Sequence, residues 1–327
     1  MELGLCFIVN NSCTNRCKYC YEKFDNSFFL TKESFKKTIS FFENSVVWNK
    51  EIEFFGGEPM LNNNQLRDII STYSEFNYSL ITNGFFFNED DYWKYLKGFE
   101  KVHISVSLEA NKETHNYFRN PNDNYEKMLN RILDNKENDI SINMSINKKM
   151  FENLDDTIIN INKIINSNKE IHFYLIKGND GFESLDDFNN CLNLLKEKSV
   201  KIYTYLLKNL IKGIESDFEF LCSFDKKITV LPNGDLISCM WDKTFYGNIE
   251  TNILDDILKN YIERISYNHK TIWKKCNECE VPVGICNISC TPYIINHLDK
   301  GEEDKLNLKC EIQKELFKRR REIECQI

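Results

Sequence analysis

The sequence lacks the features of an exported, membrane-bound or nucleic-acid-binding protein. The apolar run at residues 3–9 follows no basic segment, and it is too short for a signal peptide or a membrane span. The 42 Lys and Arg residues are interleaved with the 50 Asp and Glu residues, for a net charge of -8, and they form no basic arm or stripe. We therefore expect a cytoplasmic protein with no membrane and no nucleic acid as partner.

Glycine and proline are also few, and internal repeats and low-complexity tracts are absent. With 12 Gly, 5 Pro and 42% hydrophobic residues, the composition is that of an ordinary globular protein. The 327 residues suit one large α/β domain with a smaller appendage, or two medium domains. This length excludes a mini-protein that depends on staples for its stability.

Cysteine is the residue that the sequence has in excess. The chain has 13 cysteines, and because this number is odd they cannot all pair in internal disulfides. In a reducing compartment, clustered cysteines are more often thiolate ligands for metal than cystines. The cysteine content therefore favours metal binding.

Short β-rich runs alternate with segments of helical periodicity up to about residue 180, a pattern typical of βα units with parallel strands. Six units predict an α/β fold with a partial, TIM-like (β/α)6 barrel over residues 1–183. A helical connector over 184–220 and a small Cys-rich α+β domain over 221–327 are expected to follow. The expected strands are 3–9, 51–55, 78–82, 102–108, 141–146 and 171–176, and the expected helices are one that begins at Thr31, then 63–76, 89–97, 124–134, 154–165, 184–213 and 254–265, with a β-hairpin around 232–235.

Polar and cysteine residues stand directly after the predicted strands. In a parallel barrel, the loops that leave the carboxyl ends of the strands converge on one face, where chemistry is expected. The first strand is followed by Cys13, Cys17 and Cys20, the second by Gly56, Gly57, Glu58 and Pro59, the third by Asn83, and the fourth ends at Ser107 and Glu109.

Three thiolates within eight residues, at Cys13, Cys17 and Cys20, can hold one metal centre and leave one coordination position open. Structural zinc almost always takes four protein ligands. A cubane iron–sulfur cluster held by three cysteines instead keeps one iron free for another ligand. The trio therefore favours an iron–sulfur cluster.

This CxxxCxxC motif resembles that of the radical S-adenosylmethionine (radical SAM) superfamily, and Tyr19 before the third cysteine fits the family form. The resemblance implies that the trio binds a [4Fe-4S] cluster. Gly56, Gly57 and Glu58 resemble the segment that holds the ammonium group of S-adenosylmethionine, and Asn83 is placed among the cofactor-binding residues. Independently of the family, paired glycines allow close approach to the main chain, and a carboxylate is a natural partner for an ammonium group.

The fourth strand ends with a variant of another motif of this family. Ser107 and Glu109 match the position where the family commonly shows Ser-Leu-Asp-Gly and contacts the cofactor, and here Glu109-Ala110 replaces Asp-Gly. His115 and Arg119 then fit the family's His-Asp…Arg stretch, with Asn116 in place of Asp. The resemblance thus implies cofactor contacts for Ser107 and Glu109.

A second cysteine set, after residue 221, resembles the SPASM extension of radical SAM enzymes, and this resemblance implies two auxiliary [4Fe-4S] clusters. The family pattern assigns one group of four cysteines to one cluster and a group of three to the other, which then has an open iron that could bind substrate. Structural zinc sites are the alternative, but seven thiolates do not divide into two tetrahedral sites without another ligand. The group of four is Cys276, Cys279, Cys286 and Cys310, and the group of three is Cys222, Cys239 and Cys290.

Three cysteines and the histidines lie outside these sets. Cys6, within an apolar strand, and Cys191, within a helix, are interpreted as small buried side chains. Cys325 is interpreted as part of a frayed terminal helix, although a thiol donates a hydrogen atom to a substrate radical in some relatives. His103, His172 and His297 have no ligand spacing and are interpreted as structural or surface residues.

The resemblance implies that an electron enters the first cluster and cleaves S-adenosylmethionine to methionine and a 5′-deoxyadenosyl radical. The protein aims this radical at one C–H bond, and the difficult chemistry belongs to the cofactors. The favoured function is maturation of a ribosomally made peptide by thioether or carbon–carbon cross-linking, with an external electron donor. No catalytic side chain is identified.

Three other functions stay open, namely formylglycine generation on a sulfatase, peptide epimerisation and, without enzymatic activity, a zinc-binding adaptor. In the sulfatase-maturing group an Asp directly follows the hairpin cysteine, whereas here Met240 and Trp241 precede Asp242, which weakens that alternative. Because Cys13 lies so near the N-terminus, we expect no peptide-recognition domain before the barrel. Binding of a leader peptide would then need a separate protein or another surface.

Overall fold

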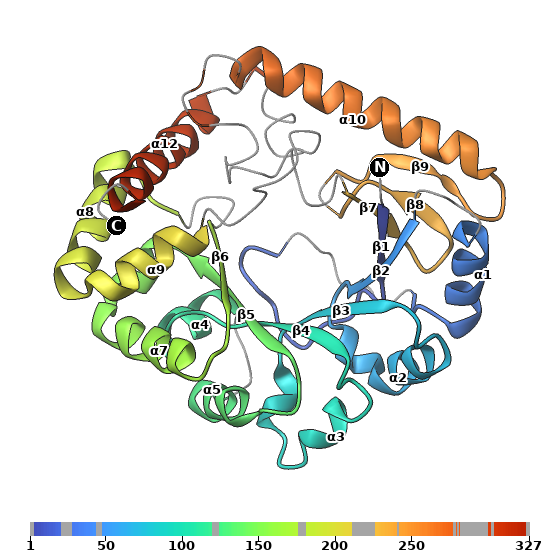
Figure 1. Ribbon diagram of the computed structural model, residues 1–327, viewed down its shortest axis with the longest axis horizontal. Coiled ribbons are helices and arrows are strands. Elements are labelled where there is room, and N and C mark those ends of the chain that lie inside the picture. The colour runs from blue at the N-terminus through green and yellow to red at the C-terminus, as the bar shows by residue number, and fades with distance from the viewer. Residues whose placement is uncertain are drawn as a thin grey trace. The chain divides into compact units, whose positions relative to one another are not determined.

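The computed structural model describes residues 3–20, 28–43, 48–119, 124–175, 181–210, 226–240, 242–276, 279, 281, 300–301 and 304–324 (Figure 1). By contact, the chain divides into two compact units. The first consists of residues 1–108, 115–142 and 224–263, and the second of residues 109–114, 143–223 and 264–327.

The first unit is built on a mostly parallel sheet with the strand order β4-β3-β2-β1-β7-β8-β9. Neighbours from β4 to β7 run parallel, and β8 and β9 are added antiparallel. The expected α/β fold with parallel strands is therefore confirmed. These strands are β1 (Leu3–Ile8), β2 (Trp48–Phe55), β3 (Asn77–Thr82), β4 (Val102–Ser107), β7 (Lys227–Val230), β8 (Asp235–Ile237) and β9 (Phe245–Asn248).

Strand β7 comes from the region expected to begin the Cys-rich domain, yet it pairs in parallel with β1. Cys6 stands opposite Glu53 of β2 on one side and Thr229 of β7 on the other. The predicted hairpin is present, because β7 and β8 pair antiparallel and Gly234 between them takes the positive φ of 85° that the turn requires. The pairing of β7 with β1 links residues more than 220 apart, which local sequence patterns do not reveal.

The side chain of Phe7, in β1, packs against helix α1 (Lys32–Phe42). Phe7 is fully buried, and its ring centroid lies 4.8 Å from that of Phe35 in α1 and 6.4 Å from that of Phe54 in β2. The helix begins where the sequence predicts it, because the Thr31 side chain accepts a hydrogen bond from the Ser34 amide at 3.0 Å. This aromatic cluster holds α1 on one face of the sheet.

A row of polar side chains connects β4 with the segment that begins β5 (Ile140–Ile146). His103 Nδ1 lies 2.8 Å from Asp139 Oδ2, and His103 Nε2 lies 3.0 Å from the hydroxyl of Ser141, which is itself 2.9 Å from the Ser105 hydroxyl. His103 thus ties β4 to the start of β5. This agrees with its interpretation as a structural residue.

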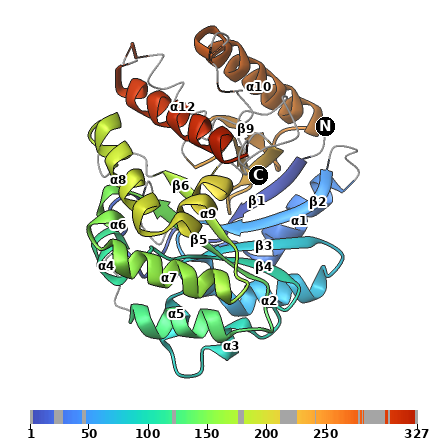
Figure 2. The ribbon, with the colours of Figure 1, turned by 60° about the vertical axis from the view of Figure 1, so that its left-hand side comes forward.

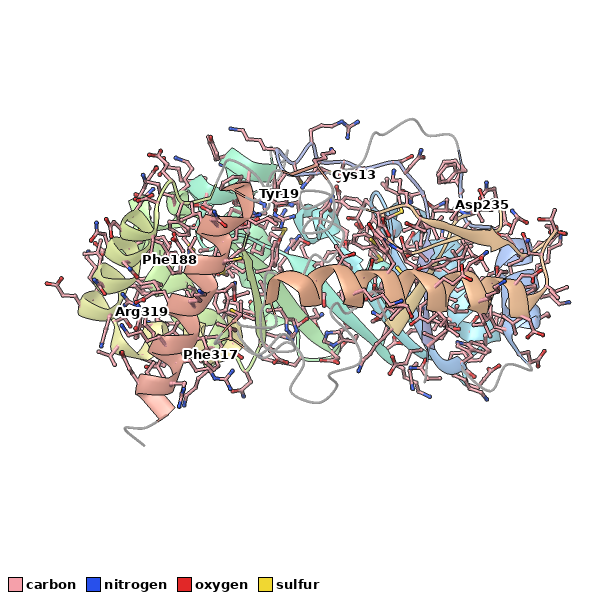
Figure 3. All side chains as sticks on the ribbon, turned by 90° about the horizontal axis from the view of Figure 1, so that it is seen from above. Cys13, Tyr19, Phe188, Asp235, Phe317 and Arg319 are labelled. Carbon is pink, nitrogen blue, oxygen red and sulfur yellow. The ribbon has the colours of Figure 1, made fainter. Side chains whose placement is uncertain are left out.

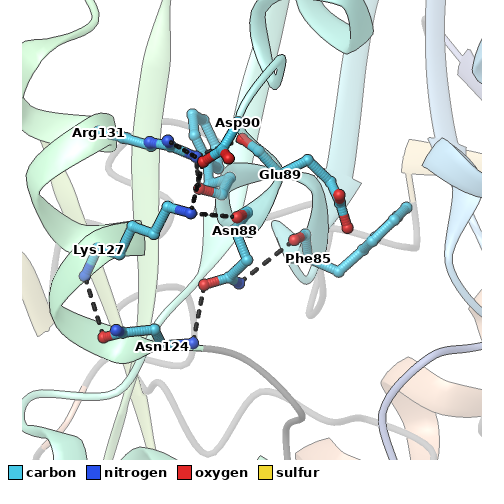
Figure 4. Close-up of polar contacts among 8 residues, drawn as sticks. Phe85, Asn88, Glu89, Asp90, Asn124, Lys127 and Arg131 are labelled. Carbon is cyan, nitrogen blue, oxygen red and sulfur yellow. Dashed lines mark hydrogen bonds and ion pairs between the residues drawn. The ribbon is translucent and has the colours of Figure 1, made fainter.

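The loop after β3 is fastened to helix α5 (Tyr125–Asp134), as Figure 4 shows. Lys127 donates to the Asn88 carbonyl at 2.7 Å and to Asp90 at 2.9 Å. Arg131 donates to the carbonyls of Phe87 and Glu89. Of the expected helix 89–97, only α3 (Trp93–Leu96) is present, and a short η2 (Phe85–Asn88) precedes it. The contacts of Lys127 and Arg131 hold the backbone between η2 and α3 in an irregular path.

The second unit contains the end of β5, strand β6 (Ile171–Leu175) and mostly helices. The segment 184–213, expected to be helical, contains the two helices α8 (Leu185–Lys198) and α9 (Val200–Leu210), which meet at Ser199, where the backbone is extended. These two helices lie side by side, and α9 packs next to β6 (Figure 2). The other helices among the described residues are α2 (Asn63–Thr72), α4 (Lys112–Arg119), α6 (Lys148–Glu152), α7 (Leu154–Asn166), α10 (Leu254–Cys276) and α12 (Asp304–Glu324), with a short η1 (Pro59–Asn62).

One arginine connects α12 with α8 and α9. Arg319, labelled in Figure 3, donates hydrogen bonds to Asn193 at 2.8 Å and Asn189 at 2.9 Å, and it forms an ion pair with Glu315 at 2.6 Å. Helix α10 extends 11 residues beyond its expected end at residue 265. None of the helices in the described ranges combines the length and apolarity that crossing a membrane requires.

We predict that Phe35→Ala destabilises the cofactor-free protein by about 3–5 kcal/mol, because it leaves a cavity between α1 and the sheet. Urea denaturation would measure the change. The matched control is Phe245→Ala, at a side chain that is 57% exposed, and it should cost less than about 0.5 kcal/mol. Equal losses in the two variants would contradict the assigned core.

Candidate active site

The loop that follows β1 carries Cys13, Cys17 and Cys20 and is fastened to the end of β2. Asn10, fully buried, donates from its side chain to the Glu58 carbonyl at 3.0 Å and to Asn62 at 2.7 Å. Its own carbonyl accepts from the Gly57 amide at 2.8 Å, and the Ser12 carbonyl accepts from the Glu58 amide at 2.6 Å. The first two strand ends therefore meet main chain to main chain.

Gly56 and Gly57 make this contact sterically feasible. A Cβ atom on Gly57 would lie 2.1 Å from the Ser12 carbonyl oxygen, and one on Gly56 would lie 2.5 Å from the Asn10 carbonyl oxygen. Gly56 also has a φ of 131°, which side chains disfavour. The two glycines, which were predicted to let a ligand approach the main chain, also let the cysteine loop approach it.

Glu58 is fully buried, and its carboxylate braces the ends of β2 and β3. It accepts hydrogen bonds from the Thr82 hydroxyl at 2.6 Å, the Asn83 amide at 2.7 Å and the Met60 amide at 3.0 Å. Burial raises the pKa of this carboxyl to about 7, although the hydrogen bonds oppose the rise. A carboxylate that is this costly to ionise would gain from a nearby cation.

Asn83 joins the third strand end to the same loop. Its side-chain amide donates to the Thr14 hydroxyl at 2.9 Å and lies 3.5 Å from the Cys13 sulfur. Burial raises the pKa of the Cys13 thiol to about 11, so that this thiol favours its protonated form when no metal is bound. The structure thus brings together three of the strand ends that the sequence analysis selected.

These residues fit a cluster that binds S-adenosylmethionine. The three thiols are half-buried on one loop, and the buried Asn15 side chain has an Nδ2 donor with no acceptor among the described residues. That N–H is available to a sulfide or a carboxylate. The described residues contain no group of three ligands close enough for a single metal ion. Thiolates of a cubane bind different irons, so they need not meet at one point.

The comparison with known families agrees with this geometry. Residues 7–158 match the model of the radical SAM superfamily, a range that contains the cysteine loop, Gly56, Gly57, Glu58 and Asn83. Residues 7–158 form a radical SAM domain.

Individual relatives extend the likeness beyond this radical SAM domain. The chain is 25% identical over 352 residues to the radical SAM cyclopropyl synthase TigE of Paramaledivibacter caminithermalis, covering 92% of this chain and 71% of that protein. Its fold is similar to that of native anSMEcpe with bound AdoMet and Kp18Cys peptide, with a TM-score of 0.66, 16% identity, and coverage of 94% and 100% of the two chains. It is also similar to Streptococcus suis SuiB bound to precursor peptide SuiA, with a TM-score of 0.63, 15% identity, and coverage of 90% and 73%.

Ser107 and Glu109, at the end of β4, belong to different contact units. Ser107 is half-buried in the first unit. Glu109 is fully buried in the second, where its carboxylate accepts hydrogen bonds from the Ser145 hydroxyl and, at 3.2 Å, from the Ser145 amide. The longer Glu side chain that replaces the expected Asp therefore reaches the end of β5.

The C-terminal cysteines are described only in part. Cys239, directly after β8, is buried, and the Asp242 amide lies 3.4 Å from its sulfur. Cys279 and Cys310 are half-buried, and Cys276 is the last residue of α10. Three predicted ligands lie outside the described residues, namely Cys222, Cys286 and Cys290. The unassigned Cys325 and His297 also lie outside them.

Two of the unassigned cysteines are described. Cys6 is fully buried in β1, and burial raises the pKa of its thiol well above the usual range. Cys191 is half-buried in α8. These positions agree with the interpretation of Cys6 as a packed side chain and leave Cys191 near a surface.

Several residues of the site were not selected from the sequence. Asn10 and Asn15 flank or lie within the cysteine loop, and Thr82 ends the third strand. Their signal is the same for all three, a polar side chain at the carboxyl end of a buried strand or just after it. His115 and Arg119, in α4, were noticed only because their stretch resembles a family motif, and the contacts of α4 with the cysteine loop form only in the folded chain.

The raised pKa of Glu58 predicts how stability changes with pH. The folded state keeps the proton up to about pH 7, whereas the unfolded chain releases it from about pH 4.5. The free energy of unfolding should therefore fall as pH rises through this window, by about 3 kcal/mol. Glu58→Gln should remove this part of the pH dependence.

Urea denaturation of the cofactor-free protein between pH 4.5 and 8 would measure this effect as the difference between wild-type and variant curves. Glu33→Gln, at a side chain that is 82% exposed, is the matched control and should follow the wild type. Parallel curves for Glu58→Gln and the wild type would show that the carboxyl titrates normally.

Proposed function

We propose that this protein is a radical SAM enzyme that modifies a ribosomally made peptide by forming a thioether or carbon–carbon cross-link. The observation that carries the proposal is the junction of the CxxxCxxC loop with Gly56, Gly57 and Asn83 inside a radical SAM domain. When bound, the cluster supplies the electron that cleaves S-adenosylmethionine to methionine and a 5′-deoxyadenosyl radical.

The chain's own residues then have distinct roles. Cys13, Cys17 and Cys20 hold the cluster, and the main chain at Gly56 and Gly57 receives the ammonium group of S-adenosylmethionine. Glu58, whose carboxylate is buried in the same segment, would add its negative charge once it is ionised. An ammonium group next to Glu58 would favour its ionised form and lower its pKa. Tyr19, Asn83, Ser107 and Glu109 are proposed to surround the rest of the cofactor.

A peptide substrate is supported by what the similar proteins bind. The anSMEcpe structure contains the Kp18Cys peptide, and the SuiB structure contains precursor peptide SuiA. TigE is a cyclopropyl synthase, a name that describes carbon–carbon bond formation and supports that arm of the proposal. An external electron donor is proposed as a further partner.

The C-terminal cysteines are proposed to hold two auxiliary [4Fe-4S] clusters within a SPASM domain, for three clusters in all. One takes Cys276, Cys279, Cys286 and Cys310. The other takes Cys222, Cys239 and Cys290 and keeps an open iron for a substrate thiolate. Otherwise, these clusters would accept the electron of the product radical. A reducing cytoplasm would keep the cysteine thiols available as ligands.

Formylglycine generation is kept as a second candidate because of one contact. Although Met240 and Trp241 separate Asp242 from Cys239 in sequence, the backbone turns so that the Asp242 amide lies 3.4 Å from the Cys239 sulfur. Its carboxylate is held by the hydroxyls of Ser238 and Thr244, each at 2.8 Å. Asp242 therefore stands close to the hairpin cysteine despite the longer spacing. Epimerisation has no such contact in its favour.

Anaerobic reconstitution should load about twelve iron atoms per chain, four for each cluster. Replacing Cys13, Cys17 and Cys20 with Ala should remove about four of them and abolish 5′-deoxyadenosine formation from S-adenosylmethionine under a strong reductant. The control is Cys191→Ala, which should keep both the iron and the cleavage. Zinc without a brown chromophore would support the adaptor alternative instead.

The reaction would be assigned by mass spectrometry of the peptide encoded beside this protein after incubation with the reduced enzyme. Cross-linking should lower the peptide mass by two hydrogens, because one C–H and one further X–H bond are replaced by one new bond. No change of mass would indicate epimerisation. Conversion only of a sulfatase-derived peptide to its formylglycine form would favour the second candidate.

A further inference from the structure

The end of helix α4 clamps the cysteine loop. The Lys18 amide donates to the Phe118 carbonyl at 2.7 Å, and the Tyr19 and Phe118 ring centroids are 5.7 Å apart. The Lys18 ammonium lies 3.1 Å from the centroid of the Tyr117 ring. One backbone hydrogen bond and two ring contacts thus fix the loop between its second and third cysteines.

Arg119, the last residue of α4, adds a charge to this clamp. Its guanidinium carbon lies 5.5 Å from the centroid of the Tyr19 ring, and the residue is only 4% exposed. Tyr19 is next to Cys20 in the sequence, and Figure 3 labels it together with Cys13. A guanidinium that is always charged is therefore fixed beside the loop that carries the three thiols.

Arg16, in the same loop, offers an internal comparison. It donates to the Cys13 carbonyl at 2.7 Å and to the Asn15 carbonyl at 2.8 Å, but its side chain is exposed to solvent. Water and salt screen an exposed charge far more than a buried one. Two cations thus contact the cysteine loop, and Arg119 is the buried one of the two.

Reduction of a cluster adds one negative charge to it. A nearby cation stabilises the reduced form more than the oxidised form, and the net charge around a cluster is one of the factors that set its reduction potential. A buried cation has the larger effect because the medium around it is less polarisable. The one-electron step needs an external donor, which loses the electron that the cluster gains, and no proton moves.

We propose that Arg119 raises the reduction potential of the cluster on Cys13, Cys17 and Cys20, and that its stacking on Tyr19 positions this charge. The inference rests on the proposed function, because it requires that cluster. Arg119 is a positioning and charge-bearing residue, and it need not contact substrate. Helix α4 follows the fourth strand in sequence, but its last residues contact the loop that follows the first strand.

The test is an anaerobic redox titration of the reconstituted full-length protein, followed by electron paramagnetic resonance. The signal that changes on addition of S-adenosylmethionine reports the cluster on the first loop. At the wild-type midpoint, Arg119→Gln should lower the ratio of reduced to oxidised cluster about tenfold. Arg119→Lys keeps the charge and should stay within about twofold of the wild type, as should Arg16→Gln, whose lost charge is screened.

Each outcome decides the inference. A ratio within about twofold of the wild type in iron-loaded Arg119→Gln would overturn it, as would an equal loss in Arg119→Lys. If Arg119→Gln does not retain iron, Arg119→Lys decides alone, with a wild-type ratio in support and a tenfold loss against. A wild-type protein that binds no iron would overturn the proposed function itself, which is a different result from an unchanged ratio in a loaded variant.

Discussion

The site depends on the contact between two main-chain segments, the loop after β1 and the turn after β2. Their carbonyl and amide groups lie 2.6–2.8 Å apart at Asn10, Ser12, Gly57 and Glu58. Only residues without a Cβ permit this approach, so Gly56 and Gly57 determine where the cysteine loop lies. Asn83 then joins the third strand to the same loop, and the three strand ends form one surface.

Charge at this surface is arranged by burial as well as by residue type. Glu58 is a buried acid whose pKa is raised to about 7, and its hydrogen bonds only partly offset the cost of ionisation. A bound ammonium group would offset more of it. Within the cysteine loop, Tyr19 contacts the buried guanidinium of Arg119. The site is thus prepared for a cationic ligand group near one segment and for added negative charge near the other.

The prediction from sequence succeeded where the signal was local. Short β-rich runs marked β1 to β4, the Thr31 cap marked the start of α1, and the residues after the strand ends pointed to the cysteine loop. It was right that the segment 184–213 is helical over its described residues, and wrong about the extent of the helix at 89–97. There Lys127 and Arg131, more than 35 residues away, hold the loop.

The amino-acid sequence by itself determined the kind of chemistry, because three thiols at CxxxCxxC spacing, two glycines and a carboxylate are properties of short segments. The tertiary structure alone decided that β7 joins β1, that Glu58 is buried among Thr82 and Asn83, and that Arg119 reaches Tyr19. The physical reason is that burial, and with it pKa and charge screening, depends on which distant segments pack together. Such contacts leave no periodic trace in the sequence.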